Sequence, residues 1–436
     1  MPTYREVFMK GKLKLGIAGL GTVGIGVLKI LESHAKLINQ RSDRTIELVA
    51  VSAKTRSKER GISLKEFEWE SEITNLARRA DIDVFVELIG GEENPAKEAI
   101  EIALNSGKHV ITANKALISK HGQQLAILAE KNNVSLKFEA AVAGGIPAIK
   151  TLIESLAGNK ITRIMGVMNG TCNYILTRME SANLSYEKVF NEAKALGYLE
   201  ADPTLDVGGI DASHKLSILS SIAFGTQIEM NAIDIQGIEQ ITIQDIEHVR
   251  EMGYRIKLLG VSELTDEGLE QRMQPCLVPA ASPIGQLENA MNMIIFDGDN
   301  SGQIILRGAG AGEGPTASAV MSDIIDVARG AYIPTFGCPA KDLTKSKKAS
   351  TSTESAYYVR TKLKDAPGVL AKMASALGNN KISIDQMHQT QHADAAAPVF
   401  IVTHKTLPET LRRALKEVVK TGVTMEDPVA LRIEEV

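Results

Sequence analysis

The sequence of 436 residues predicts an α/β protein of two or three domains, because it is too long for one ordinary core. Residues 12–144 alternate short apolar segments with helical ones, which favours an open, mostly parallel sheet with helices on both faces. Residues 356–433 have the order β-α-β-β-α-β of a ferredoxin-like domain. Between them we expect a mixed α+β unit at 145–339 and a polar, basic linker at 340–355.

The strands expected in the first unit are short and nearly all apolar: "LKLGIAG", "IELVAVS", "DVFVELIG", "KHVITAN" and "VSLKFEAAV". The helices expected between them are "TVGIGVLKILESHAKLI", "NPAKEAIEIALNSG" and "ALISKHGQQLAILAEKNN". Asn94 is a favourable N-cap, Pro95 suits the first helical turn, and Gly107 suits the helix end. This alternation predicts a doubly wound sheet of the Rossmann type.

The composition argues against several classes of partner. A net charge of −4, from 49 basic and 53 acidic residues, gives no reason to expect nucleic acid or an anionic membrane. No apolar run approaches the roughly 18–20 residues that span a bilayer, and the N-terminus lacks the apolar core of a secretion signal. Cys172, Cys276 and Cys338 lie far apart without metal-type spacing. We therefore expect a reduced, cytoplasmic setting.

A glycine-rich loop follows the first expected strand. Its spacing is Gly19-x-Gly21-x-x-Gly24, and it opens an apolar helix, which is the context that dinucleotide binding requires. Glycine permits the tight turn, the close approach of a pyrophosphate and the packing of helix on sheet, while the helix N-terminus offers free N–H groups. The residues expected to contact the cofactor are Gly19, Gly21, Thr22, Val23 and Gly24. A glycine turn without a ligand is the alternative.

The end of the second expected strand distinguishes between two nicotinamide cofactors. It contains Lys54 and Arg56 and no acid, whereas an NAD site would place Asp or Glu there to hold the ribose 2′-hydroxyl. Basic side chains suit a 2′-phosphate, so NADP(H) is favoured, with Arg56 as its contact and NAD(H) as the alternative. The competing interpretation is that these side chains only face solvent.

Carboxylates are concentrated in "GYLEADPTLDVGGIDASHK", which contains Glu200, Asp202, Asp206 and Asp211 and ends on Lys215. Because Lys215 follows Asp211 by four residues, the two face the same side of a helix. Reduction of an aldehyde requires a proton for the growing alkoxide, which a positioned lysine can donate. An exposed ion pair beside a solvated loop is the alternative.

Five motifs in order resemble the homoserine dehydrogenase family over residues 12–339: "GKHVITANKAL", "EAAVAGGIP", "GVMNGTCNYIL", "GYLEADPTLDVGGIDASHKL" and "GAGAGEGPTASAVMSDI". The segment "KDAPGVLAKMASALGNNKISI" resembles an ACT domain. Because no aspartate kinase domain precedes the glycine loop, the resemblance is to the monofunctional form. It implies NAD(P)H-dependent reduction of L-aspartate 4-semialdehyde to L-homoserine, on the route to threonine, methionine and isoleucine. Leu199 departs from the small residue usual in the family.

The resemblance implies a role for each polar residue of this site. The implied catalytic residues are Lys215, Asp211, Asp206 and Lys115. Glu200, Asp206 and Lys115 would hold the amino-acid part of the substrate, and Lys115 and Gly312 would lie near the nicotinamide. Lys115 could instead be a surface lysine, and "GAGAGEG" could serve only close backbone packing. Asp202 receives no role, and Cys172 is expected to be a packing residue rather than a nucleophile.

The resemblance also implies a cation and an effector. A sodium-like monovalent cation would be bound, largely by main-chain oxygens, at Glu139, Val142, Gly144 and Ile146. A strand that runs into a glycine turn is the alternative. The ACT domain would bind an amino acid, with threonine as the expected effector and Gly368 and Asn380 as contacts; a purely structural role is the alternative. Pairing of both units favours a homodimer or homotetramer.

Two other functions compete with this one. A dinucleotide- and amino-acid-sensing protein without catalysis would keep the glycine loop but dispense with Lys215. A thioester-forming semialdehyde dehydrogenase would require a reactive cysteine.

Overall fold

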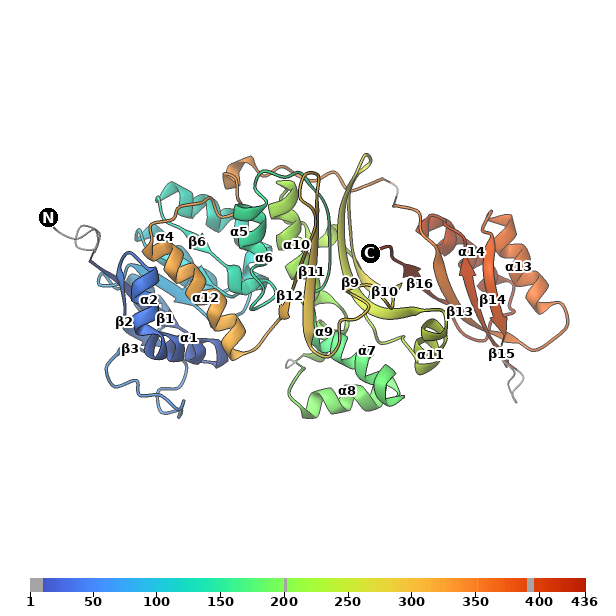
Figure 1. The fold of residues 1–436 in the computed structure, drawn as a ribbon, viewed down its shortest axis with the longest axis horizontal. Helices are drawn as coiled ribbons and strands as arrows, with labels where there is room; N and C mark the ends of the chain where they lie inside the picture. Colours follow the sequence, from blue (N-terminus) through green and yellow to red (C-terminus); the bar gives the residue numbers. More distant parts are fainter. Residues whose placement is uncertain (1–10, 200–201, 351, 390–395) are drawn as a thin grey trace.

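A six-stranded parallel sheet forms the first unit of the computed structural model, which describes residues 11–199, 202–350, 352–389 and 396–436 (Figure 1). The strand order is β3-β2-β1-β4-β5-β6, the order of a doubly wound dinucleotide-binding fold. The strands are β1 (Lys12–Ala18), β2 (Thr45–Ser52), β3 (Glu68–Glu70), β4 (Val84–Glu87), β5 (His109–Thr112) and β6 (Leu136–Lys137). The predicted parallel sheet is confirmed.

The helices of this unit are α1 (Thr22–Ser33), α2 (Ala35–Arg41), α3 (Ile73–Arg78), α4 (Ala96–Asn105) and α5 (Lys115–Lys131). The helix expected after the glycine loop is therefore interrupted at His34. The prediction that Asn94 caps α4 is wrong, because the N-cap is Pro95, whose carbonyl oxygen accepts from the Ala99 N–H at 3.1 Å.

The expected strand "VSLKFEAAV" is also shorter than predicted. β6 ends at Lys137, and a 3₁₀ turn follows at Glu139–Ala141. The N–H of Glu139 donates to the Asp323 carboxylate at 2.9 Å, so at this residue a side chain takes the bond that a neighbouring strand would make. An apolar run in the sequence does not reveal that a side chain distant in the chain will accept this main-chain hydrogen bond.

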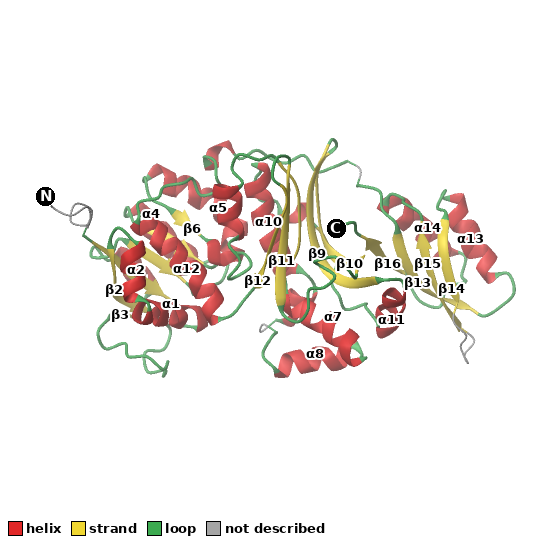
Figure 2. Ribbon diagram, viewed as in Figure 1, coloured by secondary structure: helices red, strands yellow, loops and turns green. Residues whose placement is uncertain are grey.

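A second, mixed sheet has the order β12-β11-β7-β9-β10-β16-β13-β15-β14, with β8 beside β10. Figure 2 shows its run from β10 through β16 and β13 to β15 and β14. Its strands are β7 (Ile161–Val167), β8 (Asp234–Ile235), β9 (Tyr254–Thr265), β10 (Gly268–Pro279), β11 (Met291–Gly298), β12 (Gly302–Ala309), β13 (Tyr357–Lys364), β14 (Ile384–Gln389), β15 (Ala396–Thr403) and β16 (Val429–Ile433). The remaining helices are α6 (Ala148–Lys150), followed by a π-helical turn at Thr151–Ser155, α7 (Gly170–Ala182), α8 (Tyr186–Ala195), α9 (Pro203–Val207), α10 (Ile210–Phe224), α11 (Ile243–Glu251), α12 (Glu313–Ala328), α13 (Val369–Asn379) and α14 (Pro408–Lys420).

Helix α12 carries the chain from the second sheet back to the first unit, where it lies beside α1 (Figure 1). The contact is close: a Cβ at Gly26 would stand 2.8 Å from the Glu313 carbonyl oxygen and 2.9 Å from the Ala317 methyl group. Only glycine fits at residue 26 without displacement of α12. The first unit and the second sheet are therefore joined by packing as well as by the chain.

The C-terminal β-α-β-β-α-β unit is present as predicted, and its sheet is continuous with that of the central unit. The continuity comes from β16, which pairs in parallel with β10 through Cys276–Arg432 and Leu277–Ile433. The segment expected as a linker lies against the central unit, where Lys348 forms a bridge with Leu269. Among the described residues, none of the helices has both the length and the apolar character needed to cross a membrane.

A buried ionic network lies where the two parts of the second sheet meet. Glu434, just after β16, accepts hydrogen bonds from Arg163 and Arg272 at 2.6 Å each and from Arg432 at 3.2 Å. Glu434, Arg272 and Arg432 are each at most 5% exposed. One carboxylate thus pairs with guanidinium groups from β7, β10 and β16, and Glu270 supplies a second anion to Arg272.

Substitution Glu434→Gln should leave these guanidinium groups without their shared anion. Loss of one partner of a buried ion pair costs about 3–5 kcal/mol, so we expect the first unfolding transition to shift to lower temperature by several degrees. Glu435→Gln is the matched control, because that side chain is 81% exposed and its pair with Lys405 lies at the surface. Scanning calorimetry measures both variants, and equal midpoints for the two would contradict the role assigned to Glu434.

Candidate active site

Lys215 and Asp211 form a buried ion pair one turn apart on α10. The Lys215 Nζ atom lies 2.7 Å from Asp211 Oδ2 and also donates to the Met168 carbonyl oxygen at 2.9 Å. Lys215 is 9% exposed and Asp211 7% exposed. The predicted i,i+4 pair is confirmed, and the exposed-pair alternative is wrong because the pair is buried against the segment before α7.

A second lysine reaches the same carboxylate from the first unit. Lys115, the first residue of α5 at the carboxyl end of β5, lies 2.8 Å from Asp211 Oδ1 through its Nζ atom. Burial opposes the charge on Asp211, but the ammonium groups of Lys215 and Lys115 hold the pKa of this carboxyl well below its usual range. Asp211 therefore remains an anion between two cations.

The turn that carries Lys115 is fixed by a buried hydrogen-bond network. The Glu87 carboxylate, at the end of β4, accepts from Thr112 Oγ1 at 2.6 Å and from the N–H groups of Ile89 and Gly90. Thr112 Oγ1 accepts from the Asn114 N–H, and the Asn114 side chain caps α5. The sequence reasoning did not identify Glu87, although an acid at the end of an otherwise apolar strand was a visible signal.

Asn169, the N-cap of α7, touches both carboxylates of the site. Its Oδ1 atom accepts from the Cys172 N–H at 2.8 Å, while Nδ2 donates to Asp206 Oδ1 at 3.0 Å and to Asp211 Oδ2 at 3.2 Å. Asp206 lies in α9 and is buried. The sequence analysis missed Asn169; its signal was an asparagine before a helical segment within the "NGTCNY" motif.

The other acids of the motif differ in position. Asp202 is the N-cap of α9, and its carboxylate accepts from the Thr204 N–H at 3.1 Å, which gives this exposed residue a structural role. Glu200, predicted to hold the substrate, lies outside the described residues. The structure thus brings Asp206, Asp211, Lys115 and Lys215 together and leaves the position of Glu200 a prediction.

Cys172 has the surroundings of a packing residue. Its thiol is fully buried and donates to the Asp206 carbonyl oxygen at 3.2 Å. Burial, reinforced by the charges of Asp206 and Asp211, raises the pKa of the thiol well above its usual value. A nucleophilic cysteine needs the opposite shift, which argues against a thioester-forming enzyme.

The glycine loop is shaped as its motif predicts. Gly19 has φ +99°, and a Cβ there would lie 2.5 Å from the Leu88 carbonyl oxygen. A Cβ at Gly24 would lie 2.0 Å from the Gly19 carbonyl oxygen, whereas one at Gly21 would meet no described atom within 4 Å. Gly21, Thr22 and Val23 open α1, and no described side chain caps this helix. Its N-terminal N–H groups are therefore open to a pyrophosphate.

Two arginines and one tryptophan lie beside this loop. The guanidinium carbons of Arg56 and Arg60 lie 5.7 and 5.9 Å from the centre of the Trp69 ring. Arg60 donates to the main-chain oxygens of Leu20, Thr55 and Lys58, so it ties the segment after β2 to the glycine loop. Arg56 remains exposed. Sequence reasoning identified Arg56 but missed Arg60 and Trp69, because only the fold places β3 next to β2.

The second glycine-rich segment meets the turn after β6. Gly312, with φ +118°, is the N-cap of α12, whose first residue, Glu313, pairs with Lys29 of α1 at 2.7 Å. A Cβ at Gly144 would stand 2.6 Å from the Gly310 carbonyl group. Close backbone packing therefore requires glycine at residue 144. Gly312 lies near α1, the helix that follows the glycine loop, which is consistent with the predicted cofactor contact.

The predicted cation residues Glu139, Val142, Gly144 and Ile146 all lie in this turn. The Glu139 carboxylate accepts from the N–H groups of Ile149 and Lys150, and burial with the nearby Asp323 raises its pKa to about 8. Within the described ranges, no group of three or more acidic, histidine or cysteine side chains could hold a metal ion. The Glu139 carboxylate thus already accepts from two main-chain N–H groups.

The two predicted effector contacts lie at opposite ends of α13, about 18 Å apart by helical rise. Gly368, with φ +82°, precedes the helix, and Asn380 follows it. The Asn380 amide donates to the Ala376 carbonyl oxygen and to Glu417, and accepts from Arg413. One small amino acid therefore does not contact both residues within one chain.

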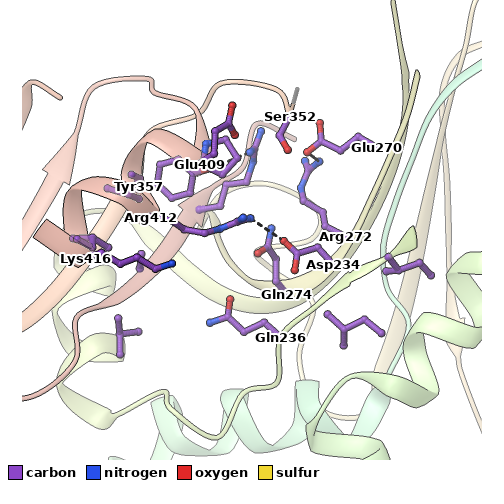
Figure 3. Close-up of a pocket in the computed structure, with 18 of the residues that line it drawn as sticks. Asp234, Gln236, Glu270, Arg272, Gln274, Ser352, Tyr357, Glu409, Arg412 and Lys416 are labelled. Carbon is purple, nitrogen blue, oxygen red and sulfur yellow. Dashed lines mark hydrogen bonds and ion pairs between the residues drawn. The ribbon is translucent and has the colours of Figure 1, made fainter. Parts of the chain in front are cut away.

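A cleft of about 1190 Å³ lies away from the lysine–carboxylate cluster, between β10 and α14 (Figure 3). Two ion pairs lie in its lining: Arg412 lies 3.2 Å from Asp234, and Arg272 lies 2.9 Å from Glu270. This cleft contains none of the residues predicted for the reaction.

Comparison with known proteins agrees with this geometry. The family models described as "Homoserine dehydrogenase, NAD binding domain", "Homoserine dehydrogenase" and "ACT domain" match residues 19–139, 147–325 and 357–420. The homoserine dehydrogenase of Neisseria gonorrhoeae is 39% identical over 430 residues, which is 97% of this chain and 98% of the relative. The chain belongs to the homoserine dehydrogenase family.

Solved structures give the same result. A homoserine dehydrogenase from Thiobacillus denitrificans is 37% identical, has a TM-score of 0.92 and covers 98% of this chain and 100% of its own. A hyperthermophilic archaeal homoserine dehydrogenase in complex with NADPH is 26% identical, with a TM-score of 0.62, over 72% of this chain and 97% of its own. The chain is an oxidoreductase that acts on a CH–OH group with a nicotinamide cofactor.

Proposed function

We propose that this protein reduces L-aspartate 4-semialdehyde to L-homoserine with NADPH, in the biosynthesis of threonine, methionine and isoleucine. The observation that carries the proposal is the Asp211 carboxylate, with Lys215 at 2.7 Å and Lys115 at 2.8 Å. One lysine comes from the central unit and the other from the carboxyl end of the parallel sheet, where ligands bind in such folds. Family membership supports the reaction.

A bound nicotinamide supplies the hydride in this reaction, and the chain's own residues manage charge and the proton. Lys215 Nζ donates a proton to the developing alkoxide oxygen, and Asp211 orients this ammonium and balances its charge. Asp206 and Glu200 receive the substrate ammonium group, while Lys115 receives its carboxylate or the reacting oxygen. Burial of the pair strengthens each of these electrostatic contacts, because water is excluded.

The residues beside the glycine loop fit a dinucleotide with a 2′-phosphate. Gly21 leaves open space above the start of α1, and Arg56 presents an exposed guanidinium group near the end of β2. Arg60 is committed to main-chain oxygens, so Arg56 is the contact that we assign to the 2′-phosphate. NAD(H) would lack this contact, which favours NADP(H).

Three further assignments belong to this proposal. Main-chain oxygens in the turn from Glu139 to Ile146 would hold a sodium-like cation. The ACT domain would bind threonine next to Gly368, with residues from a partner chain completing the site. Such a shared site requires at least a homodimer.

Substitution Lys215→Ala should remove the proton donor. We expect kcat for the aldehyde to fall by about a hundredfold or more while NADPH binding is kept. NADPH oxidation, followed by absorbance, measures the loss, and Lys188→Ala, at an exposed residue of α8, is the matched control. Near-normal turnover of a folded Lys215→Ala variant would refute the assignment.

Substitution Arg56→Ala should weaken NADPH about tenfold or more, since a charge-assisted hydrogen bond is worth about 1.5–3 kcal/mol. NADH binding should change little. Trp69 is the single tryptophan of the chain and lies under Arg56, so its fluorescence can follow binding of either cofactor. Lys58→Ala removes the same charge from a nearby exposed residue. An equal effect of both substitutions on NADPH would mean that only general charge matters.

Threonine should lower the rate of the reaction by binding away from the active site. Gly368→Val should relieve this inhibition, because a β-branched residue does not tolerate the φ of +82° at that turn. Arg412→Ala, in the cleft beside α14, should leave the response intact. Steady-state kinetics with and without threonine measure the rate and KM of each variant. If threonine changes neither value in the unmodified protein, it is not the effector.

A further inference from the structure

Asn169 is a buried side chain that links the groups of the reaction site to one another. It is 4% exposed and precedes α7. Its amide nitrogen donates to Asp206 and to Asp211, and the preceding Met168 carbonyl oxygen accepts from Lys215. Two consecutive residues thus contact both carboxylates and the lysine that pairs with one of them.

The orientation of this amide follows from its partners. The N–H of Cys172 is a donor only, so the atom that faces it, at 2.8 Å, must be the amide oxygen. The amide nitrogen then necessarily faces the carboxylate oxygens of Asp206 and Asp211, which are acceptors. The helix cap therefore determines which end of the side chain meets the acids.

Two carboxylates beside one another repel, and each needs a donor or a cation to remain charged when buried. Asp211 has two lysines, but one of its oxygens also receives the Asn169 amide at 3.2 Å. Asp206 Oδ1 receives the same amide at 3.0 Å. Because the Asn169 amide is neutral, it donates to both acids without adding a charge to the site.

We propose that Asn169 is a positioning residue that fixes Asp206 and Asp211 relative to each other. Asp211 in turn orients the Lys215 ammonium group toward the substrate oxygen. The proposal rests on the proposed function, since it assumes that Lys215 donates the proton. Asn169 would have no contact with the substrate carbon and would act only through these acids.

Two variants separate this role from helix capping. Asn169→Asp keeps an oxygen for the Cys172 N–H and replaces the donor with a carboxyl oxygen. Asn169→Ser keeps a favourable N-cap but is too short to bridge the acids. Among the described residues, the titratable groups whose charges interact with these carboxylates include Lys115 from α5, Lys215 and His214 from α10, and Cys172 from α7.

The measurement is kcat for the aldehyde against pH, with circular dichroism and Trp69 fluorescence to establish folding and NADPH binding. Asn169→Ser should lower kcat about tenfold or more by the same factor at every pH. Asn169→Asp should lose less activity at acid pH, where its carboxyl group keeps a proton and can still donate, and more as that proton is lost. The pH profile of Asn169→Asp should therefore show one additional ionisation, which a residue that only caps α7 would not produce.

Several results would overturn the proposal. Both variants could keep kcat within about twofold of the unmodified protein, or Asn169→Asp could show the same loss at every pH as Asn169→Ser. If Asn169→Asp does not fold, unchanged kcat in a folded Asn169→Ser variant suffices to reject it. Failure of the proposed function is a separate result, since the unmodified protein would then not oxidise NADPH with the aldehyde or Lys215→Ala would remain active.

Discussion

The buried carboxylate of Asp211 is the constraint on which the site depends. Taking a charge out of water is costly unless it is paired and hydrogen-bonded, and here the compensation comes from Lys215, Lys115 and Asn169. These partners belong to α10, α5 and the start of α7. The first unit and the central unit must therefore keep a fixed separation for the carboxylate to remain satisfied.

Close backbone contacts maintain that separation. Helix α12 lies against α1 because Gly26 has no side chain, and the turn at Gly144 lies against Gly310 for the same reason. The two contacts hold α1 and the turn after β6 against the segment from Gly310 to the start of α12, beside the expected cofactor position. A larger residue at either glycine would displace the backbone segment packed against it.

The ACT domain is attached more firmly than a flexible tether would allow. Its strand β16 pairs with β10, and Glu434 compensates the charge of arginines from both parts of the sheet. A change in the ACT domain that shifted β16 would act directly on β10 and, through β9 and β7, on the segment before α7. These contacts run without a break from the ACT domain to Met168, whose carbonyl oxygen accepts from Lys215.

The sequence by itself determined the features that depend on local spacing. The glycine loop, the Asp211–Lys215 pair and the order of the ACT elements follow from backbone geometry over a few residues. The two failures differ in cause. At α4 the N-cap lies one residue later than expected, at Pro95, and at "VSLKFEAAV" the Glu139 N–H donates to the distant Asp323 carboxylate. Sequence resemblance placed Lys115 in the site, but tertiary structure alone decided that it pairs with Asp211, that Asn169 contacts both acids and that Arg60 and Trp69 lie beside the glycine loop. Residues far apart in the chain meet only when the sheets and helices pack.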